Sequence, residues 1–339
     1  MAQHIGKQTM VFSSPVSVLE TAVTVGTKEG EGPLGKYFDC VLKDNMAGCK
    51  CWETAESKIV EQNIRLLMRK NPAHIDYIIS GDLLNQCCAS TYGIRGLDIP
   101  FFGIFGACST FGEALGLAAA LVDGGGAENV IAAASSHFCS AERQFRFPLE
   151  LGNQRPPTAT YTVTGDGAAI VSNTDAPPYI TAITTGKIVD YGIKDSSNMG
   201  AAMAPAAADC ICAHFADTGR NPDYYDLIIT GDLGYVGKEL LLGLLEEKGL
   251  DISKQHSDCG IEIFDRETQD THSGGSGCAC SAAVFGGMLF RKLKSGMLKR
   301  ILFVPTGALM STDSLNEGES IAGIAHAAAI ESEAVKWNI

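Results

Sequence analysis

The sequence of 339 residues lacks any cluster of lysine and arginine, and its formal net charge is −13. A surface that binds nucleic acid needs clustered cations to displace the counterions of the phosphates, so nucleic acid is excluded as a partner. The N-terminus has neither the charged segment nor the apolar segment of a secretory signal peptide. No apolar run approaches the roughly 18 residues that a membrane-spanning helix requires. We therefore expect any membrane association to depend on a partner protein.

Metal-binding cysteine patterns are also missing, although the chain contains 12 cysteines. Three C-x-C pairs occur, at 49–51, 210–212 and 278–280, but none has the C-x-x-C spacing or the nearby histidines of a zinc site. Most cysteines lie among apolar or small residues, which is typical of reduced, buried thiols in a cytosolic protein. We expect no cofactor, and no metal bound by the protein alone.

What the sequence does contain is an internal repeat. Residues 70–83 and 220–233 align without a gap, and eight of the fourteen positions are identical. A weaker repeat at an offset of 171 relates two sets of residues: Gly106, Gly116, Gly125 and Val130, and Gly277, Gly287, Gly296 and Ile301. Such repetition indicates a duplicated supersecondary unit. We expect two halves, 1–175 and 176–339, that share one core because no long linker separates them.

Apolar residues make up 45% of the chain and charged residues 19%, a composition typical of α/β proteins. Apolar periodicity and runs of β-branched residues then place the elements. We predict helices at 53–70, 109–121, 236–247 and 280–293, a helix after Pro205, and strands around 9–12, 17–24, 78, 99–105, 130–134, 228–229 and 301–304. We also predict a hairpin in which strands 160–163 and 168–171 are joined by a turn at 165–167.

Cys108 is the residue best placed for chemistry. It follows Gly106 and Ala107 and lies at the first turn of the helix predicted at 109–121. Free backbone N–H groups and the helix dipole at such a position lower the pKa of a thiol. Position alone fits either a nucleophile or a small buried thiol at a packing contact.

The duplicated halves, the cysteine at a helix start and the segments 165–171 and 275–282 resemble the thiolase superfamily, which includes β-ketoacyl-acyl carrier protein synthase III. The resemblance implies an α/β fold of duplicated αβα layers, with two mixed five-stranded sheets and central buried helices. The helices that begin near Cys108 and Cys280 should then lie side by side. Four segments are similar to the stage V sporulation protein AD family: residues 136–147, 198–205, 270–277 and 318–326.

The family resemblance implies a function in the spore. It implies a non-catalytic protein that binds dipicolinic acid, or its Ca²⁺ chelate, and supports its uptake into the developing spore and later germination. It also implies a peripheral position at the spore inner membrane, with other spore membrane channel proteins as partners. The superfamily further implies a homodimer, in which the strand at the end of 124–134 pairs with its two-fold mate.

Two alternatives stay open. One is an acyl-thioester condensing enzyme that uses Cys108 and His272, and the other is a dimeric scaffold that docks a membrane channel. Condensing enzymes of the superfamily pair their cysteine with His and Asn, or with two His. Asp232 stands where the first His would follow its strand, and a carboxylate facing Cys108 would raise the pKa of the thiol. His272 is the only candidate for the second partner, so Cys108 and His272 form at most a vestigial pair.

In the binding interpretation the same residues meet a ligand. Amides and the hydroxyls of Ser109 and Thr110 would hold one carboxylate, with His272 nearby. Asp232 would contact ligand-borne Ca²⁺, since this cation prefers oxygen ligands. Cations for a free dianion would come from Arg143, Arg146 or Arg155. Asp82, the internal counterpart of Asp232, shows that a Gly-Asp turn also serves structure alone.

Overall fold

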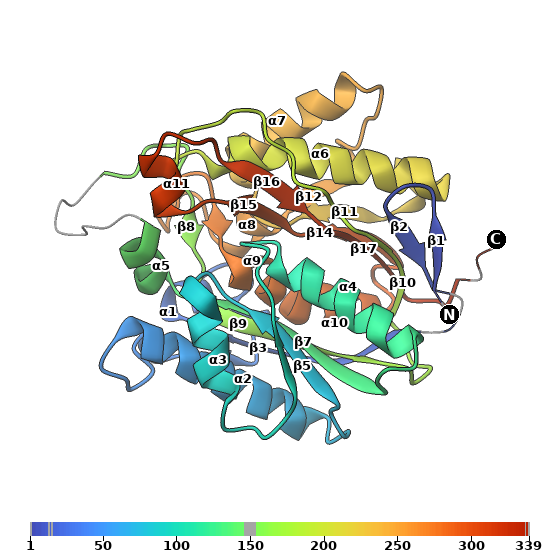
Figure 1. The fold of residues 1–339 in the computed structure, drawn as a ribbon, viewed down its shortest axis with the longest axis horizontal. Coiled ribbons are helices and arrows are strands. Elements are labelled where there is room, and N and C mark those ends of the chain that lie inside the picture. The colour runs from blue at the N-terminus through green and yellow to red at the C-terminus, as the bar shows by residue number, and fades with distance from the viewer. Residues whose placement is uncertain (1, 13, 15, 146–153, 336, 338–339) are drawn as a thin grey trace.

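The structure is a computed structural model that describes residues 2–12, 14, 16–145, 154–335 and 337 (Figure 1). Its main feature is a mixed sheet of 13 strands, ten of which follow one another in the order β12-β11-β14-β17-β10-β3-β9-β7-β5-β6. The first half contributes β3 (Ser17–Val25), β5 (Tyr77–Gly81), β6 (Phe101–Gly103), β7 (Asn129–Ser136) and β9 (Gly165–Ser172). The second half contributes β10 (Tyr179–Thr184), β11 (Leu227–Thr230), β12 (His256–Asp258), β14 (Arg300–Val304) and β17 (Ala327–Glu331).

The strand pairing repeats between the halves. Outward from the centre, β3-β9-β7-β5-β6 and β10-β17-β14-β11-β12 both show two antiparallel pairings followed by two parallel ones. The two five-stranded sets meet where Tyr179 pairs with Ser17. The strands β5 and β11 carry the sequence repeat at 70–83 and 220–233. The predicted duplicated α/β fold is therefore confirmed, and residue 175 falls in the connection between β9 and β10.

Two central helical stretches separate the two sets of strands. One is α4 (Thr110–Asp123), and the other is continuous from α9 (Cys278–Val284) through the π-helical η5 (Phe285–Leu289) to α10 (Phe290–Lys294). The buried rings of Phe111 in α4, Phe285 in η5 and Phe303 in β14 pack together, with centroids 5.1 to 6.1 Å apart. The two helices thus lie side by side, as predicted, and both halves share one core.

Outer helices cover the two sets of strands (Figure 1). The helix α2 (Trp52–Lys70), with α3 (Cys88–Ile94), packs on the first half, and α6 (Met199–Thr218), with α7 (Gly234–Glu246), packs on the second. By length and composition α6 would span a bilayer, but 67% of its apolar window is buried inside the fold. It is therefore a core helix of the second half.

Shorter elements connect these layers. They are β1 (Gln3–Ile5), β2 (Thr9–Val11), α1 (Thr27–Gly30), η1 (Gly35–Tyr37), β4 (Cys40–Val41), η2 (Asn85–Cys87), α5 (Phe138–Phe145), β8 (Tyr161–Thr162), η4 (Pro222–Tyr224), α8 (Cys259–Ile263), β13 (Gly275–Ser276), β15 (Thr306–Leu309), α11 (Thr312–Asn316) and β16 (Ala322–Ala325).

The predicted hairpin around residues 165–167 is wrong. Residues Gly165–Ser172 form the single strand β9, and β8 pairs with β13 instead. The glycines serve close packing, because a Cβ on Gly167 would lie 2.5 Å from the backbone of Ala282 in α9. Glycine inside a strand here marks the close approach of a helix and not a turn.

The predicted pairing of the strand after residue 124 with a two-fold mate is also wrong. That strand is β7, and both of its edges are occupied, by β5 and β9. The outermost strand of the first half is β6, which within the described chain pairs only with β5. Phe102 in β6 and Phe105 just after it are each 48% exposed.

Candidate functional site

Cys108 lies in the tight connection between β6 and α4. Ala107, just before it, has a φ of 49°, a left-handed conformation that is uncommon for residues with a Cβ. This turn directs the thiol into a cavity of about 70 Å³ between the two halves. The cavity is lined by Leu83, Phe105, Ala107, Cys108, Ala141, Glu142, Phe145, Thr160, Thr162, Met199, Met203, Ser276, Ala308 and Met310.

Ser109 and Thr110 stabilise the turn. Both side chains are buried, and their hydroxyls donate to the carbonyls of Gly106 and Ala107 at 2.6 Å. The N–H groups of the same two residues also donate to those carbonyls, both at 3.1 Å. Neither residue lines the cavity, so the structure does not place these predicted ligand donors on its wall.

Asp232 is buried beside Cys108, at the end of β11. Its Oδ2 accepts hydrogen bonds from Ser276 Oγ at 2.7 Å and from the Gly277 N–H at 3.1 Å. Its Oδ1 accepts from Thr306 Oγ1 at 2.8 Å. Ser276 Oγ in turn lies 3.8 Å from Cys108 Sγ, so four side chains form one connected polar group.

Sequence reasoning missed Ser276 and Thr306. A signal for Thr306 existed, because it follows β14, the strand that pairs in parallel with β11. Residues beyond the carboxyl ends of neighbouring parallel strands meet at one edge of a sheet. Ser276 lies in the glycine-rich segment 272–277, where His272 was the residue that resembled a catalytic partner.

Burial and the charge of Asp232 both keep the Cys108 thiol protonated. Burial raises the pKa of the Cys108 thiol well above its usual value, and the negative charge of Asp232 raises it further. Burial also raises the pKa of Asp232, while hydrogen bonds from Ser276, Cys108 and Thr306 act in the opposite direction. Thiolate is the form that attacks acyl groups and alkylating agents, and this arrangement disfavours it.

The internal counterpart of Asp232 has a different task. Asp82 accepts hydrogen bonds from two backbone N–H groups, one in its own turn at 2.9 Å and one in α3 at 2.8 Å. In the second half the turn amides of Leu233 and Gly234 donate instead to Asp258 from β12, at 2.9 and 3.0 Å. Because Asp258 stabilises this turn, Asp232 is available to face Cys108.

His272 lies away from Cys108. Its Nε2 is 3.3 Å from Asp270 Oδ1, and it is not among the residues that line the cavity. The described part of the cavity wall contains no histidine. The structure therefore does not bring the predicted pair Cys108 and His272 together.

The three arginines predicted as ligand cations are also not found on the described wall of this cavity. Arg143 forms an ion pair with Glu53 of α2. Arg155 donates through Nη2 to the carbonyl and the carboxylate of Asp270, at 2.9 and 3.1 Å. Arg146 lies outside the described residues.

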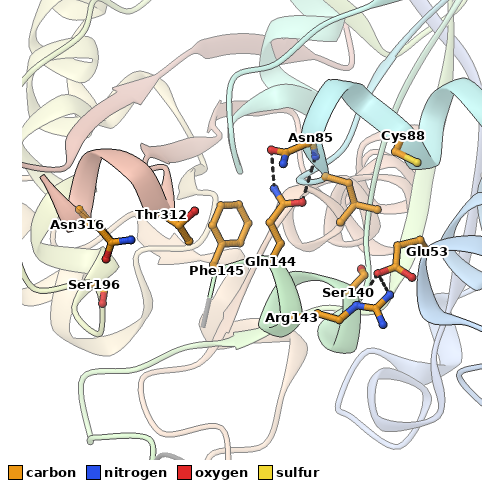
Figure 2. A pocket seen from close by; sticks show the side chains of 12 residues that line it. Glu53, Asn85, Cys88, Ser140, Arg143, Gln144, Phe145, Ser196, Thr312 and Asn316 are labelled. Carbon is orange, nitrogen blue, oxygen red and sulfur yellow. Dashed lines mark hydrogen bonds and ion pairs between the residues drawn. The ribbon is translucent and has the colours of Figure 1, made fainter. Parts of the chain in front are cut away.

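A wider cavity of about 830 Å³ adjoins the first (Figure 2). Its wall is polar and includes the Arg143 ion pair and an amide pair, in which Gln144 Nε2 donates to Asn85 Oδ1 at 3.2 Å. Phe145 lines both cavities, so the wider cavity lies next to the Cys108 cavity. Within the described chain no group of three or more His, Cys, Asp or Glu side chains is arranged to hold a metal ion.

Comparison with known proteins decides the family. Residues 6–331 match the sequence model described as Stage V sporulation protein AD. The chain belongs to this family. The stage V sporulation protein AD of Bacillus subtilis (strain 168) is 46% identical over 329 residues, which cover 96% of this chain and 97% of that relative.

Solved structures similar to this member of the stage V sporulation protein AD family include a 3-oxoacyl-[acyl-carrier-protein] synthase III and OleA. The 3-oxoacyl-[acyl-carrier-protein] synthase III of Aquifex aeolicus has a TM-score of 0.55 and 13% identity, covering 93% of this chain and 99% of that one. The cerulenin-bound OleA of Xanthomonas campestris has a TM-score of 0.58 and 13% identity, covering 95% and 97%. At this identity the likeness shows the fold alone, which is the predicted thiolase fold.

Proposed function

We propose that the protein binds dipicolinic acid, or its Ca²⁺ chelate, in the cavity beside Cys108 and supports its uptake into the developing spore. Membership of the stage V sporulation protein AD family supports a role in sporulation. The observation that carries the binding role is the site itself: a protonated thiol lines a cavity whose described wall has no histidine, and a hydrogen-bonded acid lies behind that wall.

The side chains of the cavity wall suit a flat aromatic acid, which is larger than the cavity of about 70 Å³ and would therefore extend from it into the wider cavity. The apolar part of the wall is built from side chains that pack well on a ring: Phe105, Phe145, Met199, Met203 and Met310. Its polar part includes the hydroxyls of Thr160 and Thr162, which can donate to carboxylate oxygens, and Ser276, whose hydroxyl already donates to Asp232. The wider cavity beside Phe145 would serve as the approach to this site.

Charge favours the chelate over the free dianion. No lysine or arginine lines the cavity within the described residues, and buried Asp232 lies behind it. A dianion would be buried there without a protein cation, which costs several kcal/mol in a low-dielectric site. The chelate of one dianion with one Ca²⁺ is neutral, so we propose it as the bound form.

Calorimetry on two variants of Cys108 tests the proposal. Cys108→Ser should bind the chelate nearly as well as the wild type, because the hydroxyl still donates a hydrogen bond. Cys108→Trp should abolish binding by filling the cavity, with an unchanged circular dichroism spectrum as the control for folding. Equal binding by wild type and Cys108→Trp would place the ligand elsewhere and overturn the proposal.

The alternatives give different results in the same variants. A condensing enzyme would show acylation of Cys108 by an acyl-CoA, visible as a mass increment that is lost in Cys108→Ser. A scaffold would bind no dipicolinate with or without Ca²⁺. If no dipicolinate binds, the protein would act only in assembly.

Assembly forms part of the proposal. We propose a homodimer in which two copies pair through the outermost strand β6, since its edge is unpaired in the described chain and it exposes Phe102. An unpaired strand edge with exposed aromatic residues favours pairing with another strand. Docking to membrane channel proteins of the spore inner membrane would place this dimer at its site of action.

A further inference from the structure

A second group of charged side chains lies on the other side of β8 from the Cys108 cavity. Thr160 and Thr162 line that cavity, and side chains alternate along an extended chain, so Tyr161 points away from it. The ring of Tyr161 is stacked on Phe138, with centroids 4.0 Å apart and 6° between the ring planes. One face of the Tyr161 ring is therefore covered by an aromatic neighbour.

Two cations approach the same ring. Lys28 Nζ lies 4.4 Å from its centroid, and Arg155 Cζ lies 5.5 Å from it. Because Phe138 covers one face, both cations approach from the side that it leaves open. Burial lowers the pKa of Lys28, and the positive charge of Arg155 lowers it further. The two cations repel each other, so an anion between them would be stabilised.

Asp270 balances only part of the positive charge of Lys28 and Arg155. Its Oδ2 accepts from Arg155 Nη2, while its Oδ1 faces His272 Nε2. The other terminal nitrogen of Arg155, Nη1, is buried and has no hydrogen-bond partner. A buried donor without an acceptor costs about 1–3 kcal/mol. An oxygen ligand at Nη1 would remove this cost.

The backbone next to these groups is strained. Asp270 and His272 have φ values of 48° and 53°, in the left-handed region that residues with a Cβ seldom occupy. Such conformations cost free energy and are concentrated at functional sites. In this conformation Asp270 lies beside Arg155, and His272 lies beside Asp270.

We propose that Lys28 Nζ and Arg155 Nη1 together hold one carboxylate group of a small organic acid beside Tyr161, at a site separate from the Cys108 cavity. Glu29 and Glu31 act on Lys28 together with Asp270, so the site has little positive charge left over and favours one carboxylate over a phosphate dianion. The two nitrogens offer a charge-assisted hydrogen bond to each carboxylate oxygen. The site is independent of the function proposed for the cavity.

Chemical labelling of Lys28 tests the site with acetate as the probe. Acylation of lysines by an N-hydroxysuccinimide ester, followed by peptide mass spectrometry, should slow about threefold at Lys28 when acetate is at twice its dissociation constant, because a third of the sites are then free. Sodium chloride at equal ionic strength is the reference. Exposed Lys36 should react equally fast in both salts.

Variants separate this site from the cavity. Arg155→Gln should abolish the protection of Lys28 by acetate, whereas Cys108→Trp should leave it unchanged. Acetate should also raise the melting temperature of the wild type and not that of Lys28→Met, which removes no hydrogen bond found in the described chain. Equal protection by chloride, or stronger protection by inorganic phosphate than by acetate, would overturn the proposal.

Discussion

At the scale of single residues, the pair of Cys108 and Asp232 carries the main chemical argument. The thiol lies at a helix start, where a cysteine is often activated, yet burial and Asp232 both raise its pKa. The same acid is held by Ser276, Gly277 and Thr306, so it is fixed in place. The result is a thiol suited to donating a hydrogen bond and not to attacking an acyl group.

Removing the charge of Asp232 should make this thiol more reactive. In Asp232→Asn we expect the pKa of Cys108 to fall but to stay above its ordinary value, because burial is the larger cause. Each unit of that fall raises the thiolate fraction about tenfold at a pH below the pKa. Alkylation by iodoacetamide, read by peptide mass spectrometry, measures the change. Exposed Cys51 provides the internal reference, and an unchanged ratio of Cys108 to Cys51 labelling would contradict the expectation.

The sequence predicted some of these positions and not others. Asp232 facing Cys108 was predictable because the internal repeat and the superfamily resemblance fix where β11 ends. Ser109 and Thr110 looked like ligand donors, but their hydroxyls bond to the carbonyls of their own turn. A local pattern does not show whether a hydroxyl is already used by the backbone, since that depends on the exact turn.

At the scale of elements, α2 shows how buried polar groups find partners. Its Asn63 donates to Asp166 Oδ2 in β9 at 2.6 Å, and its Glu56 accepts hydrogen bonds from Ser135 and Ser140 at 3.0 and 2.7 Å. Burial raises the pKa of Asp166 to about 8, and burial followed by the charge of Asp82 raises the pKa of Glu56 to about 8. Both acids therefore stay largely protonated at neutral pH in the folded protein.

These buried acids should make the protein less stable as pH rises. Their folded pKa values lie above the unfolded values of 3.8 and 4.5, so the folded state binds more protons and loses stability up to about pH 8. The buried histidines 214, 256 and 326 have lowered pKa values, so they change the free energy of unfolding only below about pH 6.5. Urea unfolding should therefore show a decline in the free energy of unfolding from about pH 6.5 to about pH 8.

A variant assigns this decline to one acid. Asp166→Asn keeps an oxygen for Asn63 and should flatten the slope by up to about 1.4 kcal/mol per pH unit. The matched control, Asp251→Asn, changes an exposed acid and should leave the slope as in the wild type. Equal slopes in Asp166→Asn and the wild type would show that Asp166 is ionised in the folded protein.

The elements also show where pattern reasoning stops. The strand around 165–172 was predicted as a turn and a strand because Gly-Asp-Gly is a common turn sequence. In the structure Asp166 is buried within β9 beside Asn63. Gly167 lacks a Cβ and so allows α9 to pack closely against the strand. Both reasons are tertiary contacts with residues far away in the sequence, and no local pattern reports them.

At the scale of the whole molecule, duplication explains the arrangement of the strands. The repeat predicted a duplicated α/β fold, and the strand order confirms it, with one hydrophobic cluster formed by residues of both sets of strands. It did not predict which strand is outermost. The apolar segment that became β7 suits the interior and an interface equally well, whereas the short β6 was recognisable as an edge only once its neighbours were known.

The proposed dimer gives a prediction at this scale. Phe102→Glu adds a charge at the edge of β6 and should shift the protein from dimer to monomer, because like charges would meet across the two-fold axis. Light scattering at micromolar concentration measures the mass. Leu240→Glu, a comparable change of an exposed residue on α7, should leave the mass unchanged. A monomeric wild type, or a dimeric Phe102→Glu, would contradict pairing through β6.

Asp82 and Asp232 have different roles, and this difference affects which substitutions can be accepted at each position during evolution. Asp82 accepts the amide of its own turn, whereas Asp258 accepts the amides of the turn after β11. Position 232 therefore does not have to stabilise its own turn, whereas position 82 does. Substitution of Asp232 would keep the hydrogen bonds of the turn itself and would remove the acceptor of Ser276, Gly277 and Thr306. Its cost would therefore fall on the cavity beside Cys108, so selection on one copy of a duplicated turn acts through the proposed ligand site, and on the other copy through the turn.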